Sequence, residues 1–419
     1  MALGYLFGAL PWAVVGLLLL WAPRRPRPLA GAVFLLSVVL GEWPAFPLGY
    51  LAVMTWGQWR DEWVPGAWPG LVVTAIGAAA FLTIAVRSQW APVTVIRALD
   101  AGLGPGWESR LDPAARERWQ DYAHPGPWPG PDAGRRLRLF LLPFWLLSPR
   151  IERLPDVPYG IDDRRQHLDL YRSRDQGAGA SVLVYFHGGG YTGGSKRWES
   201  RWLLQQFARR GWLVISADYR VRPRFGMADH LADAKRVIAW AHEHAAEHGG
   251  DPRRLFVAGS SAGAHLTAIC AQTPNDPALQ PGFEDADTTV AGAIGLYGYY
   301  GDHDGDGDHD GDSRLGPVPS SPLRVAPGAG TPPFLIVHGD DDTATPVEGA
   351  RALTRHLRAA HVPVAYVELP GANHAFDVLR SVRFDAVVAG ADAFTAWVLG
   401  SADPGANRRT GSARRGRPD

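Results

Sequence analysis

The sequence predicts an α/β fold, a mainly parallel sheet with helices on both faces, preceded by an N-terminal region of transmembrane helices. Two observations support this prediction. From about residue 157, short apolar runs alternate with amphipathic helical patterns, which is typical of strands that helices cover on both faces. Before residue 88, long segments carry almost no charge. A chain of 419 residues is long enough to contain both parts.

The N-terminal region contains three apolar segments. Residues 3–22 are mostly apolar, and a helix of this length rises about 30 Å, the thickness of the bilayer interior. Residues 28–56 are apolar except for Glu42 and predict one long broken span or a short hairpin. Residues 67–86 form a further span, which Arg87 closes. Tryptophans gather near the segment ends, where indole rings favour the membrane interface.

A cleaved signal peptide and a buried soluble helical bundle are the alternatives. The signal peptide fits poorly, because no basic residue precedes the first apolar run and further apolar segments follow it. With three spans, the arginines between residues 23 and 28 place the first loop and the region after Arg87 in the cytoplasm. If residues 28–56 cross twice, the region after Arg87 lies outside. We expect three spans in a multi-pass protein of the cell membrane.

The chain divides into four parts on this basis. Residues 1–87 form the transmembrane region, and residues 88–156 form a linker or partial cap with an interfacial apolar segment at 137–147. Residues 157–400 form the α/β domain, and residues 401–419 form a disordered basic tail that would lie near anionic lipid in the cytoplasm.

The domain from residue 157 contains six predicted strands and four predicted helices. The strands are the short apolar runs 181–186, 212–216, 255–258, 291–296, 333–337 and 364–369. The helices are the amphipathic stretches 227–248, 265–272, 347–361 and 384–399. Residues 166–171 alternate between polar and apolar side chains and predict an antiparallel edge strand that opens the sheet.

The composition limits the partners. Lys+Arg and Asp+Glu balance at 42 each, so the overall charge favours neither nucleic acid nor an acidic ligand. The single cysteine, Cys270, excludes an internal disulfide. It lies in a predicted helix among apolar neighbours, so we expect a buried structural thiol.

A candidate nucleophile follows the strand at residues 255–258. The pentapeptide Gly259-Ser-Ser-Ala-Gly263 leads directly into a helix, and a G-x-S-x-G sequence between strand and helix holds its middle serine, Ser261, on a strained turn. Glycines on both sides let the two backbones approach closely. In a chain with 49 glycines the pentapeptide alone is also typical of an ordinary turn.

Three further loops follow predicted strands and carry the partners that a serine nucleophile needs. They are His187-Gly-Gly-Gly190, His338-Gly-Asp-Asp-Asp342 and Pro370-Gly-Ala-Asn-His374. Each loop alone is typical of an ordinary turn or solvated loop, and no phosphate-binding glycine motif follows. Catalytic groups collect at the carboxyl ends of parallel strands, and the order serine, acid, histidine is that of the α/β-hydrolases.

Residues 157–400 resemble the hormone-sensitive-lipase-type and feruloyl-esterase-like branch of the α/β-hydrolases. The matching motifs are Phe186-His-Gly-Gly-Gly190, Asp218-Tyr-Arg220, Gly249-Gly-Asp-Pro252, Gly259-Ser-Ser-Ala-Gly263, His338-Gly-x-x-Asp342 and His374-Ala-Phe376. The chain departs from the lipase-type pattern at Ser260, where Asp is usual, and at Ala264, where a Gly-Gly pair is usual. Both departures are similar to feruloyl esterases and isoprenylcysteine methylesterases, and the layout is similar to membrane-anchored esterases of actinobacteria.

The resemblance implies a Ser-His-Asp triad. Ser261 would be the nucleophile, His374 the base and Asp342 the acid that orients the base. Asp342 holds the acid's place in the H-G-x-x-D motif, in preference to Asp340 and Asp341. The resemblance also implies an oxyanion hole made by the N–H groups of Gly188, Gly189 and Ala262.

We therefore expect a membrane-anchored serine carboxylesterase or lipase that acts on a small-molecule or lipid ester without a cofactor or a metal. The alternatives are a feruloyl-type esterase, methylesterase, amidase or peptidase, or an inactive binding module. The low-complexity loop 301–312 begins like a calcium loop, but Ser313 stands where that loop needs a bidentate Glu, so a solvated loop is the expectation.

Overall fold

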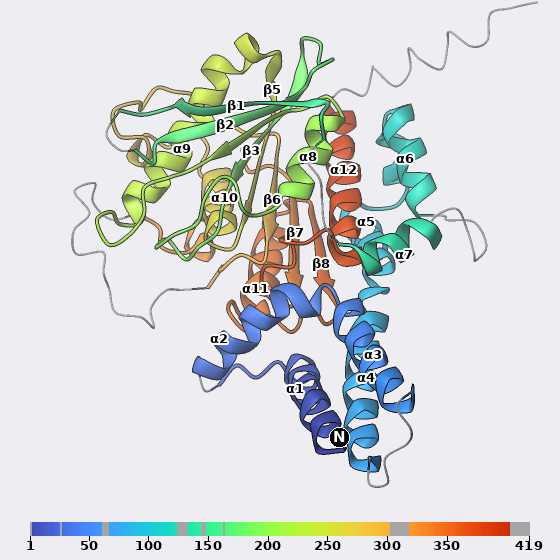
Figure 1. Ribbon diagram of the computed structural model, residues 1–419. Coiled ribbons are helices and arrows are strands. Elements are labelled where there is room, and N and C mark those ends of the chain that lie inside the picture. Colours follow the sequence, from blue (N-terminus) through green and yellow to red (C-terminus); the bar gives the residue numbers. More distant parts are fainter. Residues whose placement is uncertain are drawn as a thin grey trace, which may run out of the picture.

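The computed structural model is shown in Figure 1. It describes residues 2–25, 27–60, 67–123, 133–143, 148–161, 164–301 and 318–402. A twisted sheet lies between two layers of helices, and a bundle of N-terminal helices lies against the end of the sheet where β7 and β8 terminate (Figure 1). Residues 302–312 of the expected solvated loop, residues 403–419 of the basic tail and residues 144–147 of the predicted interfacial segment lie outside the described residues.

The sheet has eight strands in the order β1-β2-β4-β3-β5-β6-β7-β8. Its strands are β1 (Ile151–Pro158), β2 (His167–Ser173), β3 (Ala180–Phe186), β4 (Leu213–Ala217), β5 (Gly250–Ser260), β6 (Gly292–Leu296), β7 (Phe334–Gly339) and β8 (Val364–Leu369). All six predicted core strands are present, and β3 to β8 run parallel.

The edge of the sheet differs from the prediction. The segment at residues 166–171 is antiparallel as predicted, but it forms β2 and pairs on both sides, with β1 and β4. The edge strand is β1. Four consecutive residues of β1 are exposed, so its sequence lacks the alternation that would have predicted a strand.

Helices cover both faces of the sheet. They are α8 (Arg201–Arg209), α9 (Met227–His244), α10 (Ala262–Gln272), α11 (Val347–Ala359) and α12 (Val382–Ala402). Successive strand residues contribute to opposite faces: Leu183 and Tyr185 pack in the core under α8 and α12, whereas Val182 and Val184 pack in the core under α9 and α10. Two separate cores result.

The segment assigned to a linker or partial cap contributes to the first of these cores. Helix α5 (Ala91–Leu103) packs on β8 and α12, and Leu99 is fully buried. A Cβ atom on Gly102 would lie 2.5 Å from the backbone of Ala365, so only glycine allows this approach. Helix α6 (Pro113–Ala123) follows and buries Trp119 in the same core. Residues 91–123 therefore complete the sheet's helical layer.

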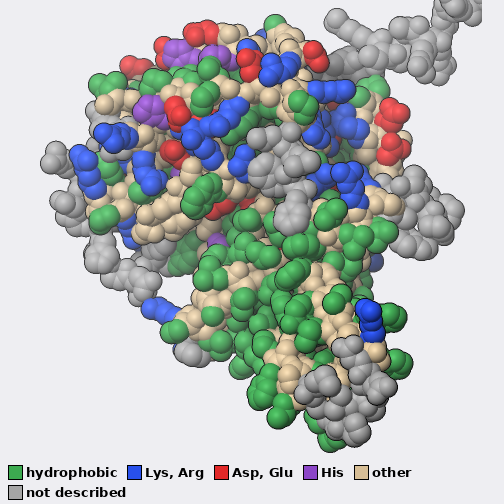
Figure 2. Space-filling view, in the orientation of Figure 1, with side chains coloured by type: hydrophobic (Ala, Val, Ile, Leu, Met, Phe, Trp, Pro, Cys, Tyr) green, Lys and Arg blue, Asp and Glu red, His purple; other side chains and the backbone are tan. Residues whose placement is uncertain are grey.

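The N-terminal bundle consists of α1 (Ala2–Trp21), α2 (Arg27–Leu36), the π-helical η1 (Ser37–Gly41), α3 (Ala45–Arg60) and α4 (Trp68–Ser88), with α7 (Ala133–Leu141) beside it. Two described helices are long and apolar enough to cross a membrane: Leu3–Trp21, and Trp68–Leu103, which joins α4 to α5. The pair Arg27–Gly41 and Ala45–Arg60 meets the same test together but is bent by 80°. Hydrophobic side chains cover the visible face of the bundle, whereas charged ones gather on the sheet domain (Figure 2).

Candidate active site

The turn between β5 and α10 has the geometry that its sequence predicts. Ser261 adopts φ 52° and ψ −116°, a region that non-glycine residues avoid. A side chain at Gly259 would overlap the carbonyl of Gly263, and one at Gly263 would overlap the carbonyl of Phe186. Both glycines are required for the close approach of strand and helix, which holds Ser261 beyond the end of the sheet.

The two adjacent serines of this turn have different surroundings. The Ser260 side chain is buried, accepts a hydrogen bond from the Tyr185 hydroxyl at 2.8 Å and donates to Asp377 Oδ2 at 2.8 Å. Ser261 is partly exposed, and its Oγ lies 2.9 Å from His374 Nε2. Only Ser261 of the pair contacts an imidazole.

The structure brings Asp342 to the other side of the same imidazole. His374 Nδ1 lies 2.8 Å from Asp342 Oδ2. The second carboxylate oxygen accepts hydrogen bonds from the N–H groups of Ala344 (2.8 Å) and Thr345 (2.7 Å), and the Thr345 hydroxyl donates to Oδ2 at 3.0 Å. His338 Nε2 lies 3.3 Å from Oδ2. The carboxylate is therefore fixed on both oxygens.

The electrostatics of the pair favour a charged acid and a basic imidazole. Burial alone would raise the pKa of Asp342, but His374 and His338 together hold it well below its usual range. Burial alone would lower the pKa of His374, and the adjacent Asp342 carboxylate reverses this effect and raises the pKa above its usual value.

The neighbouring aspartates of the His338-Gly-Asp-Asp-Asp342 motif have other partners. Asp340 Oδ1 accepts the N–H of Gly371 at 2.6 Å. Asp341 Oδ2 accepts a hydrogen bond from Arg87 Nη1 at 3.0 Å. Each of the three carboxylates thus has a distinct contact, and Asp342 is the one that contacts His374.

The glycine loop after β3 lies beside Ser261. A Cβ atom on Gly188 would lie 2.9 Å from Ser261 Cβ, and Gly189 has a φ of +108°. The N–H of Gly188 donates to Glu199 Oε2 at 2.5 Å, so a carboxylate already engages it. Ala262 begins α10, where the first N–H groups of a helix have no intrahelical acceptor.

Residues of another motif that the chain shares with the family it resembles, Asp218 and Tyr219, support this glycine loop. The His187 ring stacks on Tyr219 with ring centroids 4.5 Å apart, and the Tyr219 hydroxyl donates to the His187 carbonyl at 2.8 Å. Asp218 Oδ1 accepts the N–H of Lys196 at 2.7 Å, which holds the far end of the loop.

Two carboxylates near His374, those of the buried Asp377 and the partly buried Glu199, were not among the site residues predicted from the sequence. Burial and the charge of Asp377 raise the pKa of Glu199 to about 7. Asp377 accepts hydrogen bonds from Ser200, Ser260 and Tyr297. Asp377 follows His374 by three residues, and this short spacing could have suggested it as a site residue. Glu199 lies twelve residues after His187 and belongs to no motif.

The N-terminal bundle reaches the same site. The Phe34 ring of α2 meets the His374 ring edge-on, with centroids 5.7 Å apart, and the Tyr297 ring packs on another side at 4.6 Å. Sequence reasoning gave α2 no part in the site, because which neighbour an apolar helix packs against is not encoded in its own pattern.

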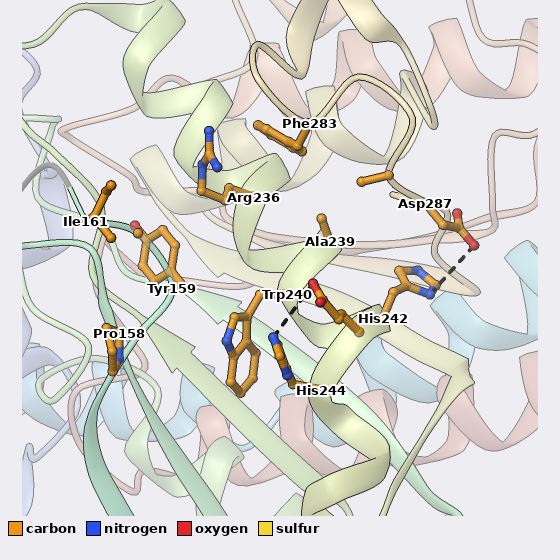
Figure 3. Close-up of a pocket in the computed structure, with 13 residues that line it drawn as sticks. Pro158, Tyr159, Ile161, Arg236, Ala239, Trp240, His242, His244, Phe283 and Asp287 are labelled. Carbon is orange, nitrogen blue, oxygen red and sulfur yellow. Dashed lines mark ion pairs between the residues drawn. The ribbon is translucent and has the colours of Figure 1, made fainter.

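Other candidate features have no contact with the triad residues. A cavity of about 640 Å³ lies between α9 and the end of β1, lined by residues that include Tyr159, Arg236, Trp240 and Phe283 and by none of the triad (Figure 3). Cys270 is buried as predicted, and burial raises the pKa of its thiol to about 11. Among the described residues, no group of three His, Cys, Asp or Glu side chains has the arrangement of a metal site.

Known protein families and curated relatives resemble this chain in sequence. Residues 183–308 match the family described as "alpha/beta hydrolase fold", and residues 316–376 match the "TAP-like protein" family. The chain is 35% identical over 332 residues to the probable carboxylic ester hydrolase LipM of Mycobacterium tuberculosis, covering 74% of each chain. Esterase LipQ of the same organism is 38% identical over 246 residues, which span 58% of LipQ.

A solved structure shows the same likeness. The butyrate-bound esterase 2 of Thermogutta terrifontis is 30% identical, with a TM-score of 0.50 over 59% of this chain and 93% of the esterase. The same esterase is also known phosphoramylated by tabun. The chain therefore belongs to the carboxylesterases of the α/β-hydrolase family and is an ester-hydrolysing enzyme.

Proposed function

We propose that this protein is a membrane-anchored serine carboxylesterase that hydrolyses apolar acyl esters through Ser261, His374 and Asp342. The observation that carries the proposal is the unbroken line of contacts from Ser261 Oγ to His374 Nε2 (2.9 Å) and from His374 Nδ1 to Asp342 Oδ2 (2.8 Å). A serine hydroxyl is a weak nucleophile at neutral pH, and such a line supplies the base and the group that orients it.

In the first half of the reaction, Ser261 Oγ attacks the ester carbonyl while His374 Nε2 takes its proton. Asp342 stabilises the imidazolium that forms. The N–H groups of Gly189 and Ala262 stabilise the oxyanion, and each such donor is typically worth about 3 kcal/mol. Gly188 N–H joins them once Glu199 releases it. His374 then donates the proton to the departing alcohol.

In the second half, a water molecule takes the place of the alcohol. His374 removes a proton from this water, which attacks the acyl-enzyme carbonyl. The tetrahedral intermediate collapses, His374 returns the proton to Ser261 Oγ, and the carboxylic acid leaves. The protein needs no cofactor for either half, because both proton transfers pass through the same imidazole.

The relatives support an ester as the substrate. LipM and LipQ are named as ester hydrolases, and the Thermogutta esterase has been solved with butyrate bound and with its covalent tabun adduct. Organophosphates of this kind react with activated serines. For this chain, the Phe34 ring beside His374 and the apolar bundle that carries it favour an apolar acyl group.

The contacts of the bundle support three spans and a catalytic domain on the cytoplasmic side. Arg24, in the basic first loop, pairs with Glu348 of α11 at 3.5 Å, so this loop lies on the same side as the catalytic domain. Arg87 at the end of α4 contacts the same domain. With α1, α3 and α4 as spans and α2 lying at the boundary, the positive-inside rule places that side in the cytoplasm.

The test is a Ser261→Ala variant of the full chain in detergent. We expect hydrolysis of p-nitrophenyl butyrate and labelling by a fluorophosphonate probe to disappear, while circular dichroism and the melting temperature stay near the wild-type values. Ser260→Ala is the matched control and should keep both reactions. Wild-type turnover in Ser261→Ala would refute the proposal.

A further inference from the structure

We propose that the N-terminal helices are a working part of the active site: Glu42, Arg87 and Arg383 act as positioning residues that hold the acid loop (residues 340–345) and the base loop (residues 370–374). The inference rests on the proposed triad, because it concerns how Asp342 and His374 are kept in contact. It assigns the bundle a role beyond anchoring the enzyme.

Arg383 is the first link between the bundle and the base loop. Its side chain is fully buried at the start of α12. Its Nη1 donates to Glu42 Oε1 at 2.9 Å and to the Gly41 carbonyl at 3.0 Å, at the end of η1. Its Nε and Nη2 donate to the carbonyls of Pro370 (3.3 Å) and Gly371 (3.1 Å). One guanidinium therefore joins the bundle to the loop that carries His374.

Glu42 is the residue of the bundle that forms the ion pair with Arg383. Its side chain is 3% exposed, and its only charged partner among the described residues is Arg383. A carboxylate in an apolar segment is costly unless it is paired, so its presence in the otherwise uncharged stretch of residues 28–56 needs a reason. Pairing with Arg383 supplies one.

Arg87 is the second link and reaches both loops. From the end of α4 its Nη1 donates to Asp341 Oδ2 at 3.0 Å, and its Nη2 lies 3.7 Å from Asp340 Oδ2. The same side chain lies against Gly371, where an added Cβ would come within 3.0 Å of Arg87 Nε. Asp341 is directly bonded in sequence to Asp342, the proposed acid.

The acid loop and the base loop are also hydrogen-bonded to each other, so a displacement of one loop would move the other. Asp340 Oδ1 accepts the N–H of Gly371 at 2.6 Å, and Asn373 Oδ1 accepts the N–H of Thr343 at 3.0 Å. Thr343 in turn donates to the carbonyl of Ala30 in α2 at 3.4 Å. The bundle, the acid loop and the base loop form one connected network of hydrogen bonds.

Helix α2 is held between the two parts of the molecule. Val33 is fully buried in a cluster with Leu19, Phe81 and Ile84 of α1 and α4. The next residue, Phe34, packs on the core of the sheet domain and on the His374 ring. Displacement of the bundle would therefore remove packing from the base itself.

The experiment compares two arginines that both join the bundle to the catalytic domain. Arg87→Gln removes a contact to the acid loop, whereas Arg24→Gln removes the exposed pair with Glu348 on α11, a residue that belongs to neither loop. The full chain is measured in detergent with p-nitrophenyl butyrate, and rates are divided by the fraction of protein that a fluorophosphonate titrates. We expect Arg87→Gln to lower kcat about tenfold and to change KM less than about twofold.

The pH profile separates positioning from a general loss of structure. If the acid loop loosens in Arg87→Gln, Asp342 raises the basicity of His374 less, and the acid limb of kcat/KM moves to lower pH. Arg87→Lys keeps the charge and should recover most of kcat. Glu42→Gln should reproduce the kcat loss and the pH shift, and Arg24→Gln should resemble the wild type.

Two results would overturn the inference. One is an Arg87→Gln variant with wild-type kcat and pH profile. The other is an Arg24→Gln variant that loses as much kcat as Arg87→Gln. The loss of any contact between the bundle and the catalytic domain, and not a shift of the acid loop, would then explain the lower kcat. If Glu42→Gln fails to fold, the half-exposed Arg87 decides the question. A failure of the proposed function is distinct, since it would appear as an active Ser261→Ala variant.

Discussion

At the scale of single residues, the structure distinguishes neighbouring serines and aspartates that have the same side chain and nearly the same position in the sequence. Two adjacent serines and three adjacent aspartates could each supply a catalytic group by spacing alone. The choice of Ser261 and Asp342 followed from motif position, and the structure gives Ser260, Asp340 and Asp341 other hydrogen-bond partners. These partners lie in distant segments, so no local pattern reveals them.

The first prediction concerns the acid. We expect Asp342→Asn to lower kcat about a thousandfold or more, because an amide cannot stabilise the imidazolium and favours the wrong tautomer of His374. Asp341→Asn should lower kcat only about tenfold, like Arg87→Gln, since it removes the same contact. Both variants are measured by p-nitrophenyl butyrate kinetics. A larger loss in Asp341→Asn would move the acid.

The second prediction concerns pH. The base must be neutral to act, so kcat/KM should rise with pH through the raised pKa of His374, which lies above 6.5. The charges of Asp342, Glu199 and Asp377 all raise this pKa. Glu199→Gln keeps the acceptor for Gly188 N–H but removes one charge, so the acid limb should move to lower pH. An unmoved limb would exclude Glu199 from the electrostatics of the base.

Glu199 also affects stability, with a definite sign. Its pKa rises from 4.5 to about 7 in the folded protein, so between these values the folded state holds a proton that the unfolded state releases. The free energy of unfolding therefore decreases as pH rises from about 4.5 to about 7. Melting curves of Glu199→Gln should lack this part of the pH dependence.

At the scale of elements, the prediction from sequence succeeded for the six core strands and the four helices of the sheet domain that it named, and it missed β1, α8 and α5. Each of the six core strands contains a short, mostly apolar and buried run, and these runs identified the strands from the sequence. Strand β1 was not predicted because four of its consecutive residues are exposed. Helix α8, which has 9 residues and an amphipathic sequence, was also missed, and α5 was assigned to a linker. Helix α2 was recognised as apolar, but its contact with His374 depends on the tertiary fold.

The third prediction tests α2 as an apolar wall of the site. Phe34 faces His374, whereas the next residue, Leu35, is 69% exposed on the outer side of the helix. We expect Phe34→Ala to lower the ratio of kcat/KM for the dodecanoate over the acetate p-nitrophenyl ester about tenfold, since it removes apolar contact area. Leu35→Ala is the control and should keep the wild-type ratio. Equal ratios in both variants would contradict the prediction.

At the scale of the whole molecule, two apolar cores lie on the two faces of the sheet, and the N-terminal bundle lies at the carboxyl ends of β7 and β8. The proposed catalytic residues lie beyond the carboxyl ends of the strands, the bundle lies against the same end at β7 and β8, and β1 forms an exposed edge of the sheet (Figure 1). Composition and hydropathy predicted both parts, but their mutual placement depends on contacts between distant segments, among them the ion pairs of Arg87 and Arg383 and the packing of Phe34. Pairs formed between residues some 250 to 340 positions apart leave no trace in local sequence.

The fourth prediction concerns orientation in the membrane. Cys270 is buried, so a cysteine placed on the surface is the only thiol that an impermeant maleimide can reach. Pro28→Cys in the first turn of α2 and Glu243→Cys on the catalytic domain should both be labelled only after cells are permeabilised. Arg60→Cys, at the far end of α3, should be labelled in intact cells. Opposite labelling of the first two would contradict a shared side.

The packing of α5 on β8 determines where the chain can be shortened. A protein that begins at residue 157 would lack α5 and α6 and expose the apolar face that Leu99 and Trp119 now cover, so it should aggregate. A protein that begins at Gln89 keeps that cover and loses only α1 to α4. Without the bundle, water would replace Glu42 as the partner of Arg383. The charge of Arg383 would then be hydrated, so the loss of Glu42 would cost little free energy of folding. A shortened enzyme should therefore start between α4 and α5, and its remaining activity would measure how much the N-terminal helices contribute to catalysis.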